Sequence, residues 1–184
     1  DFRARKQRII SSKAYVENRG AIIIGAGLAG SAVAASLSRR GWKTTVLEKN
    51  DRCAASASGN LAGVIVPMLS KDDGLAARLS RASFLSLLQE LRSFQHTQTP
   101  VHWAGCGVLQ LARNKKEESL FQEIVCTHSY PEEYVSFLTK DEASKHAGQS
   151  LPSGGFHFPR AGWVNPPSLC EARFNSNGIS LRTN

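Results

Sequence analysis

The 184-residue sequence has few cysteines and no long apolar run, and each shortage excludes a class of protein. The four cysteines lie far apart and form no C-x-x-C pair, which argues against a zinc site or a disulfide scaffold. The longest apolar stretch, glycines included, is residues 21–30, whereas a membrane-spanning helix needs about 20 residues. The basic N-terminus precedes no apolar segment of the signal-peptide kind. We therefore expect a cytoplasmic protein with reduced thiols, no metal and no membrane association.

The composition is that of a protein that buries a core, with 41% hydrophobic and 21% charged residues. This length indicates one domain, or one large domain with an insertion. Because the sequence begins with Asp1 rather than methionine, we expect it to be a piece of a longer protein.

The formal net charge of +8 is unevenly distributed. Residues 1–20 contain six basic and two acidic residues and carry +4, which leaves +4 for all the others. We interpret this basic arm as a linker or an exposed tail. A cationic arm can also bind a polyanion such as RNA through counterion release, so a solvated linker and an RNA contact both remain open.

A strand, a helix and a second strand are predicted near the start of the folded part. Residues 21–24 are a β-branched run typical of a buried parallel strand. Residues 28–40 are rich in alanine and leucine and predict a helix, and residues 44–47 predict the next strand. Such a compact βαβ unit should have a right-handed crossover.

The pattern of predicted helices and strands changes twice in the rest of the chain. A long helix is predicted over residues 75–95, with an S-x-x-D cap formed by Ser70 and Asp73. Between residues 101 and 165, short strand-like runs alternate with charged helical stretches, which indicates a separate α+β layer. Within this stretch, Thr139 and Glu142 have the spacing of a capping box. A helix that begins at Pro166 and a strand over residues 178–181 then return to the first pattern.

The most informative motif is GAGLAG, a G-x-G-x-x-G that follows a strand and opens a helix. In this context Gly25 permits a tight turn, Gly27 lets the backbone approach a pyrophosphate, and Gly30 lets the helix pack closely on the strand. The first helical residues, Leu28 and Ala29, offer backbone N–H groups to the anion. The motif therefore predicts a dinucleotide site.

The residues after the second strand narrow the choice of dinucleotide. Glu48 can accept hydrogen bonds from ribose hydroxyls and would repel a 2′-phosphate, which disfavours NADP, although Lys49 weakens that repulsion. The following segment, CAASASGNLAG, consists mostly of small residues whose backbone amides can reach a diphosphate or a flat ring. This favours FAD over NAD; an ordinary Ser/Gly loop is the alternative.

Three segments, GAGLAG, VLEK and ASASGNLAGVIVPMLS, together resemble the start of the D-amino-acid-oxidase and glycine-oxidase type of FAD enzymes. The later segment GGFHFPRAGWVNPP resembles a strand–turn–helix join of the same family. Within that family, the pattern is most similar to the oxidoreductase part of the bifunctional enzymes of tRNA 5-methylaminomethyl-2-thiouridine biosynthesis. The resemblance runs from Ala21 to the end of the sequence and lacks the family's second FAD-binding half.

The resemblance implies an α/β fold in which a Rossmann-like FAD-binding domain is intertwined with an α+β substrate domain and is incomplete at the C-terminus. The implied divisions are a basic arm (1–20), a partial FAD-binding domain (21–100 and 166–184) and a partial substrate domain (101–165). It also implies an FAD site made by the fingerprint glycines and Glu48. Further residues should lie close to the flavin: Ser58, Gly59, Asn60 and Gly63.

The reaction that the resemblance implies is oxidation of the carboxymethylaminomethyl group of a tRNA wobble uridine, with release of glyoxylate to leave aminomethyluridine. The implied partners are tRNA and a fused or adjacent methyltransferase domain. Two alternatives remain: an oxidase of a free amino acid such as glycine or sarcosine, and a non-catalytic dinucleotide-binding fragment.

No catalytic base is assigned from the sequence. Arg160 either binds the substrate carboxylate with its guanidinium fork or is a surface residue in a turn. We expect these residues alone to bind FAD weakly, to be inactive, and to expose apolar surface around residues 22–24.

Overall fold

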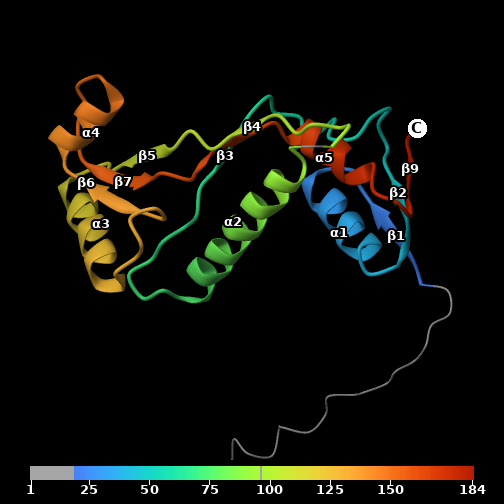
Figure 1. Cartoon of the computed structure of the whole chain (residues 1–184), viewed down its shortest axis with the longest axis horizontal. Helices are drawn as coiled ribbons and strands as arrows, with labels where there is room; N and C mark the ends of the chain where they lie inside the picture. Colours follow the sequence, from blue (N-terminus) through green and yellow to red (C-terminus); the bar gives the residue numbers. More distant parts are fainter. Residues whose placement is uncertain (1–18, 96) are drawn as a thin grey trace, which may run out of the picture.

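The structure is a computed structural model that describes residues 19–95 and 97–184. The basic arm therefore lies almost entirely outside the described residues, and its predicted role stays a prediction. The described chain is elongated, with a parallel sheet at one end and a separate helix-covered sheet at the other (Figure 1). Within the described ranges, no helix is both long enough and apolar enough to cross a membrane.

Three parallel strands form the sheet at one end of the molecule. We call this sheet and the two helices that pack on it the N-terminal unit, although its last helix and strand come from the end of the chain. The strands are β1 (Gly20–Ile24), β2 (Lys43–Leu47) and β9 (Ile179–Arg182), in the spatial order β1-β2-β9. Helices α1 (Leu28–Ser38) and α5 (Pro166–Phe174) pack against each other and against these strands. The predicted βαβ unit is confirmed, and so is the late return of the chain as a helix and a strand.

The described residues cover only one face of this sheet. Ile23 and Val46 point toward the helices, where they pack with Ala26 and Ala34 in a small core. Alternate residues of β1 point the other way, so that Ile22 is 73% exposed and Ile24 is 89% exposed. The prediction of exposed apolar surface here is confirmed, whereas the prediction that the strand is buried is wrong for this face.

A short antiparallel sheet connects the N-terminal unit to the rest of the molecule. It contains β3 (Gly63–Ile65), β8 (Gly162–Val164) and β4 (Trp103–Ala104), in that spatial order. Because β3 follows the small-residue segment and β8 directly precedes α5, the chain crosses between the two parts several times. The sequence predicted neither β4 nor β8, since strands of two or three residues carry almost no alternation.

The alternating runs between residues 101 and 165 form an α+β layer at the far end, although β4 and β8 belong to the connecting sheet, and the domain bounds stay a prediction. Strands β5 (Val108–Leu111), β7 (Gly155–Phe158) and β6 (Ser136–Leu138) form an antiparallel sheet in that order. Helix α3 (Lys115–His128) packs on it, with the rings of Phe121 and Phe156 stacked 4.0 Å apart. Helix α4 (Lys140–Ala147) begins with a capping box between Thr139 and Glu142, as their spacing predicts.

Helix α2 (Leu75–Ser93) lies between the two ends and contributes Phe84, Leu88 and Leu91 to the large core. The predicted S-x-x-D cap is wrong. Gly74 occupies the N-cap position and no side chain caps it. The carboxylate of Asp73 instead accepts two hydrogen bonds from Arg81, at 2.8 and 2.9 Å, which draws it away from the start of the helix.

Candidate dinucleotide-binding site

The glycine-rich turn lies at the carboxyl end of the parallel strands, where open α/β sheets bind their ligands. Gly25 follows β1 with φ of +96°, a left-handed conformation that favours glycine, and its N–H donates to the carbonyl of Leu47 at 2.8 Å. A Cβ atom on Gly30 would overlap the carbonyl oxygen of Gly25. Both glycines therefore have the backbone roles that the motif predicts.

Glu48 is held against this turn by its own hydrogen bonds. One carboxylate oxygen, Oε2, accepts the N–H of the fully buried Ala26 at 2.8 Å. The other, Oε1, accepts the backbone N–H of Asn50 at 3.0 Å and its side-chain amide at 2.5 Å. These bonds, that of Ala26 first, lower the pKa of Glu48. Because an ionised carboxylate offers about four acceptor positions, Glu48 can still receive a ribose hydroxyl.

Ser58 lies over the N-terminus of α1. Its hydroxyl oxygen accepts the N–H of Leu28 at 3.1 Å, and a Cβ atom on Gly27 would lie 2.8 Å from the same oxygen. The loop that carries Ser58 is also fixed at Ala54, whose N–H donates to the carbonyl of Ala26 at 3.1 Å. Gly27 therefore allows the small-residue segment to approach the fingerprint turn closely.

A cavity of about 440 Å³ opens beside this turn, and we call it the first cavity. The predicted site residues that line it are Gly25, Gly27, Glu48, Lys49 and Ser58. Four of its other lining residues, 54–57, belong to the small-residue segment that the sequence analysis singled out, whereas Ile24 and Leu47 were not predicted. Ile24 and Leu47 are the last residues of their strands, and apolar strand ends carry no sequence signal for a ligand.

A second cavity has a volume of about 380 Å³. Leu28, which directly follows Gly27 in the sequence, is one of its lining residues. Residues of β3, α2 and α5 line it, with Gly63 and Val64 from the first of these elements. The predicted residues Gly59 and Asn60 line neither cavity, and neither does Arg160. Ala29 and Gly30 belong to the first turn of α1 but do not line either cavity.

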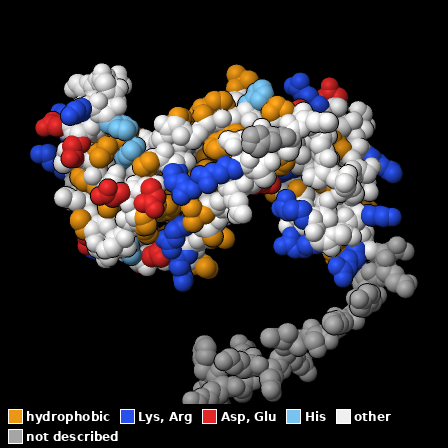
Figure 2. All heavy atoms as spheres, viewed as in Figure 1, with side chains coloured by type: hydrophobic (Ala, Val, Ile, Leu, Met, Phe, Trp, Pro, Cys, Tyr) orange, Lys and Arg blue, Asp and Glu red, His pale blue; other side chains and the backbone are white. Residues whose placement is uncertain are grey.

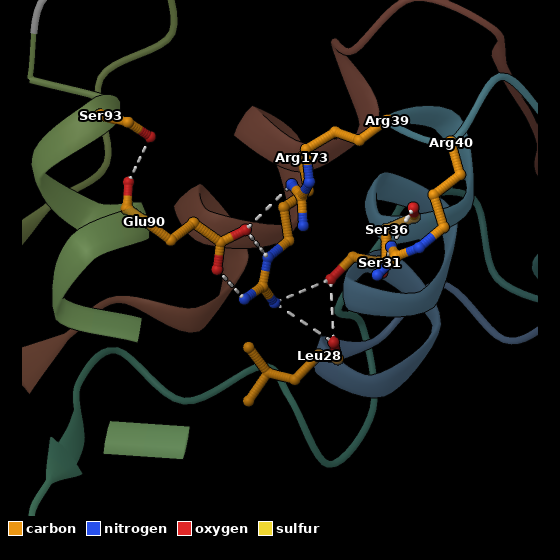
Figure 3. A network of polar contacts seen from close by, with 8 residues as sticks. All are labelled: Leu28, Ser31, Ser36, Arg39, Arg40, Glu90, Ser93 and Arg173. Carbon is orange, nitrogen blue, oxygen red and sulfur yellow. Dashed lines mark hydrogen bonds and ion pairs between the residues drawn. The ribbon is translucent and has the colours of Figure 1, made fainter. Parts of the chain in front are cut away.

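A buried arginine that the sequence did not single out supports the first turn of α1 (Figure 3). Arg173 is 6% exposed and donates to the carboxylate of Glu90 from Nε at 3.1 Å and from Nη2 at 2.5 Å. Its Nη1 donates to the carbonyl of Leu28 at 3.3 Å and to the hydroxyl of Ser31 at 3.4 Å. Since Glu90 belongs to α2, Arg173 connects three helices beside the second cavity, which Leu28 and Arg173 both line.

We next consider metal-binding groups and cysteine thiols in the part of the chain that the structure describes. It contains no group of three or more His, Cys, Asp or Glu side chains that could hold a metal ion. All four cysteines are free thiols, and Cys170 is buried beside the hydroxyl of Ser31, 3.5 Å away. Burial raises the pKa of the Cys170 thiol, so it is an uncharged packing residue at neutral pH.

Relatives of known sequence match almost all of the described chain. The tRNA 5-methylaminomethyl-2-thiouridine biosynthesis bifunctional protein MnmC of Aromatoleum aromaticum is 47% identical over 164 residues, which are 89% of this chain and 26% of that protein. The protein of the same name from Paraburkholderia phytofirmans is 41% identical over 166 residues, 90% of this chain and 25% of that protein. The chain thus spans about a quarter of the length of the curated relatives it matches.

The fold is also found among solved structures. Glycine oxidase from Bacillus cereus is 28% identical, with a TM-score of 0.63, and the match covers 90% of this chain and 46% of that one. The family model of the FAD dependent oxidoreductases (DAO) matches residues 21–184, which include the fingerprint and the residues that line both cavities. This chain belongs to the FAD dependent oxidoreductase family.

Proposed function

We propose that this chain is the FAD-binding part of an oxidoreductase that acts on the carboxymethylaminomethyl group of a tRNA wobble uridine. The products would be glyoxylate and aminomethyluridine. The observation that carries FAD binding is the first cavity, where the fingerprint turn, Glu48 and the N-terminus of α1 come together. The names of the relatives that are 41% and 47% identical support tRNA as the substrate, and the word bifunctional in them supports a second activity, which we propose belongs to a fused methyltransferase domain.

The residues present suit a dinucleotide with a diphosphate between two larger halves. Glu48 would accept the ribose hydroxyls in the first cavity, and Lys49 would lie beside it. The N–H groups at the start of α1 would hold the diphosphate, with the N–H of Leu28 exchanging the Ser58 hydroxyl for a phosphate oxygen. The second cavity, with Gly63 and Leu28 in its wall, would receive the flavin half.

The proposed reaction breaks one C–H bond and one C–N bond of the substrate. When bound, FAD supplies the two-electron acceptor for the methylene between the nitrogen and the carboxylate. Loss of a hydride from that methylene leaves a protonated imine on the substrate. Water adds to the imine carbon, one proton is released, and the C–N bond breaks to give glyoxylate and the amine on the uridine. The substrate nitrogen must be neutral at the first step, so a site that desolvates the ammonium form favours the reaction. None of this chain's residues is assigned as a base.

The experiment that tests this proposal uses the natural full-length protein that contains these residues. We expect a flavin absorption spectrum and glyoxylate release from tRNA that carries the carboxymethylaminomethyl group. Release from glycine or sarcosine but not from tRNA would favour a free-amino-acid oxidase, the alternative suggested by the likeness to glycine oxidase. A protein without bound flavin would contradict both. The 184 residues alone, measured in parallel, should bind FAD weakly and release no glyoxylate.

A further inference from the structure

The positive charge of this chain is concentrated at one end of the sequence. Residues 1–43 contain nine basic and two acidic residues, a net charge of +7. The other 141 residues contain 14 basic and 13 acidic residues, a net charge of only +1. Four of the nine basic residues lie in the described part of the chain: Arg19, Arg39, Arg40 and Lys43.

The backbone brings these four residues together at the edge of the parallel sheet opposite the first cavity. The N–H of Lys43, the first residue of β2, donates to the carbonyl of Arg19 at 2.8 Å. Arg39 caps the C-terminus of α1 and Arg40 follows it, and a tight turn in which Gly41 has φ of +77° joins them to β2. All four side chains are exposed. Figure 2 shows Lys and Arg side chains gathered at this end of the molecule, and we call the four residues the basic cluster.

Little negative charge faces the basic cluster. Arg39 lies 3.8 Å from the carboxylate of Glu90, but that carboxylate is already bound by Arg173, and the Arg39 side chain is 61% exposed. The guanidinium of Arg40 donates to the carbonyl of Ser36 at 2.7 Å, a neutral acceptor that orients the group without cancelling its charge. Elsewhere in the described ranges, several basic side chains have acidic partners: Arg81 with Asp73, Arg113 with Glu117, and Lys71 with Glu123.

We propose that the basic cluster binds the phosphate backbone of RNA. Identifying that RNA as the substrate tRNA rests on the proposed function. An α-helix rises 1.5 Å per residue, so the 11 residues of α1 place the basic cluster about 16 Å from the fingerprint turn. Contacts at that distance from the cofactor site would position a large substrate rather than recognise its modified base.

An extended polyanion fits this surface better than a small anion does. The cations come from the residue before β1, from the first residue of β2 and from the end of α1, and all four are exposed rather than gathered around a buried point.

The test compares two triple variants of the natural full-length protein. Arg39→Gln/Arg40→Gln/Lys43→Gln removes three charges from the basic cluster. Its matched control, Lys115→Gln/Lys116→Gln/Lys140→Gln, removes three exposed charges from the starts of α3 and α4. The Kd for tRNA is measured by fluorescence anisotropy from 50 to 200 mM salt, with circular dichroism and FAD titration on each variant.

We expect the basic-cluster variant to have weaker binding and a log–log salt slope that is lower by about two to three units, because each lost phosphate contact contributes about 0.7–0.9. A fourfold rise in salt would then cost the wild-type protein about 16- to 64-fold more affinity than it costs the variant. The control should match the wild-type slope. If the triple variant unfolds, the three single variants should each lower the slope by about 0.7–0.9.

Binding of the variants to phosphatidylserine vesicles is measured in parallel. Three outcomes would overturn the inference: a wild-type salt slope for tRNA in the basic-cluster variant, an equal loss of tRNA binding in the control, or a loss of vesicle binding in the basic-cluster variant with tRNA binding unchanged. The FAD titration separates this inference from the proposed function. Intact flavin binding with unchanged tRNA binding in the basic-cluster variant would remove the RNA surface alone. Cluster-dependent tRNA binding without glyoxylate release would instead remove the proposed reaction and leave the surface in place.

Discussion

Replacing Glu48 with alanine should perturb both the fold and the cofactor site. The substitution removes the acceptor for the fully buried N–H of Ala26 and both hydrogen bonds from Asn50. A buried donor left unsatisfied costs about 1–3 kcal/mol. Since a domain of this size loses about 2–4 °C in Tm per kcal/mol, the Tm of the FAD-free protein should fall by about 2–12 °C. A strand-end position alone would have suggested almost no change.

The same substitution should weaken FAD binding, because the ribose loses a charged acceptor. Hydrogen bonds to a charged group contribute about 1.5–3 kcal/mol, so the Kd for FAD should rise roughly 10- to 150-fold. Titration followed by flavin fluorescence measures this Kd, and differential scanning fluorimetry measures the Tm. Glu171→Ala is the matched control, since Glu171 is an exposed carboxylate on α5 and its loss should change neither quantity.

The two readouts separate the two roles of Glu48. Glu48→Gln keeps a carbonyl oxygen that can accept the N–H of Ala26, but its amide cannot also accept the two donors of Asn50. This variant should therefore lose less Tm than the alanine variant while still binding FAD more weakly. A lower Tm with unchanged FAD affinity in Glu48→Ala would refute the ribose assignment and leave Glu48 as a brace for the turn.

Three further predictions concern the supporting structure. Arg173→Met leaves the carboxylate of Glu90 without its buried partner, which should cost about 3–5 kcal/mol and lower the Tm by about 6–20 °C. Adding Glu90→Leu should restore most of that loss, and additive losses in the double variant would contradict the pairing. Gly30→Ala should abolish FAD binding or folding, because its Cβ overlaps backbone, whereas Gly20→Ala meets nothing within 4 Å and should be silent in the same titration. The hydrogen bond from Arg81 on α2 lowers the pKa of Asp73. This pair therefore stabilises the fold at pH values above the usual pKa range of an aspartate. That stability is lost as the pH falls through the folded pKa, and the Tm of Asp73→Asn should therefore depend less on pH in the acid range.

The parts of the fold that the sequence predicts are those encoded by neighbouring residues. The fingerprint turn depends on glycines within six positions, and the capping box of α4 depends on Thr139 and Glu142, three residues apart. Both signals are local, so both predictions are confirmed. The cap at Ser70 and Asp73 has an equally good local pattern, but the ion pair with Arg81, eight residues away, outweighs it.

The parts that the sequence does not predict depend on distant partners. Arg173 reads as an ordinary basic residue near the end of a helix, and Glu90 lies 83 positions earlier in the chain. The second cavity likewise combines β3, α2 and α5, which no spacing rule connects. Only the tertiary structure shows that an ion pair supports the turn on which the dinucleotide fingerprint depends.

The N-terminal unit has little apolar packing of its own to hold that turn. Its core consists of Ala26, Ala34 and Val46 with a few partly buried neighbours, while the large core lies under α2, α3 and the other two sheets and takes Leu169 and Ala172 from α5. One face of its sheet is uncovered by the described residues, so burial there contributes nothing. The geometry of the fingerprint turn must therefore depend on specific polar contacts, from Glu48 on one side and Arg173 on the other. A ligand that binds only the folded turn would add its binding free energy to the stability of this unit, which makes cofactor binding and folding of the N-terminal unit one coupled equilibrium.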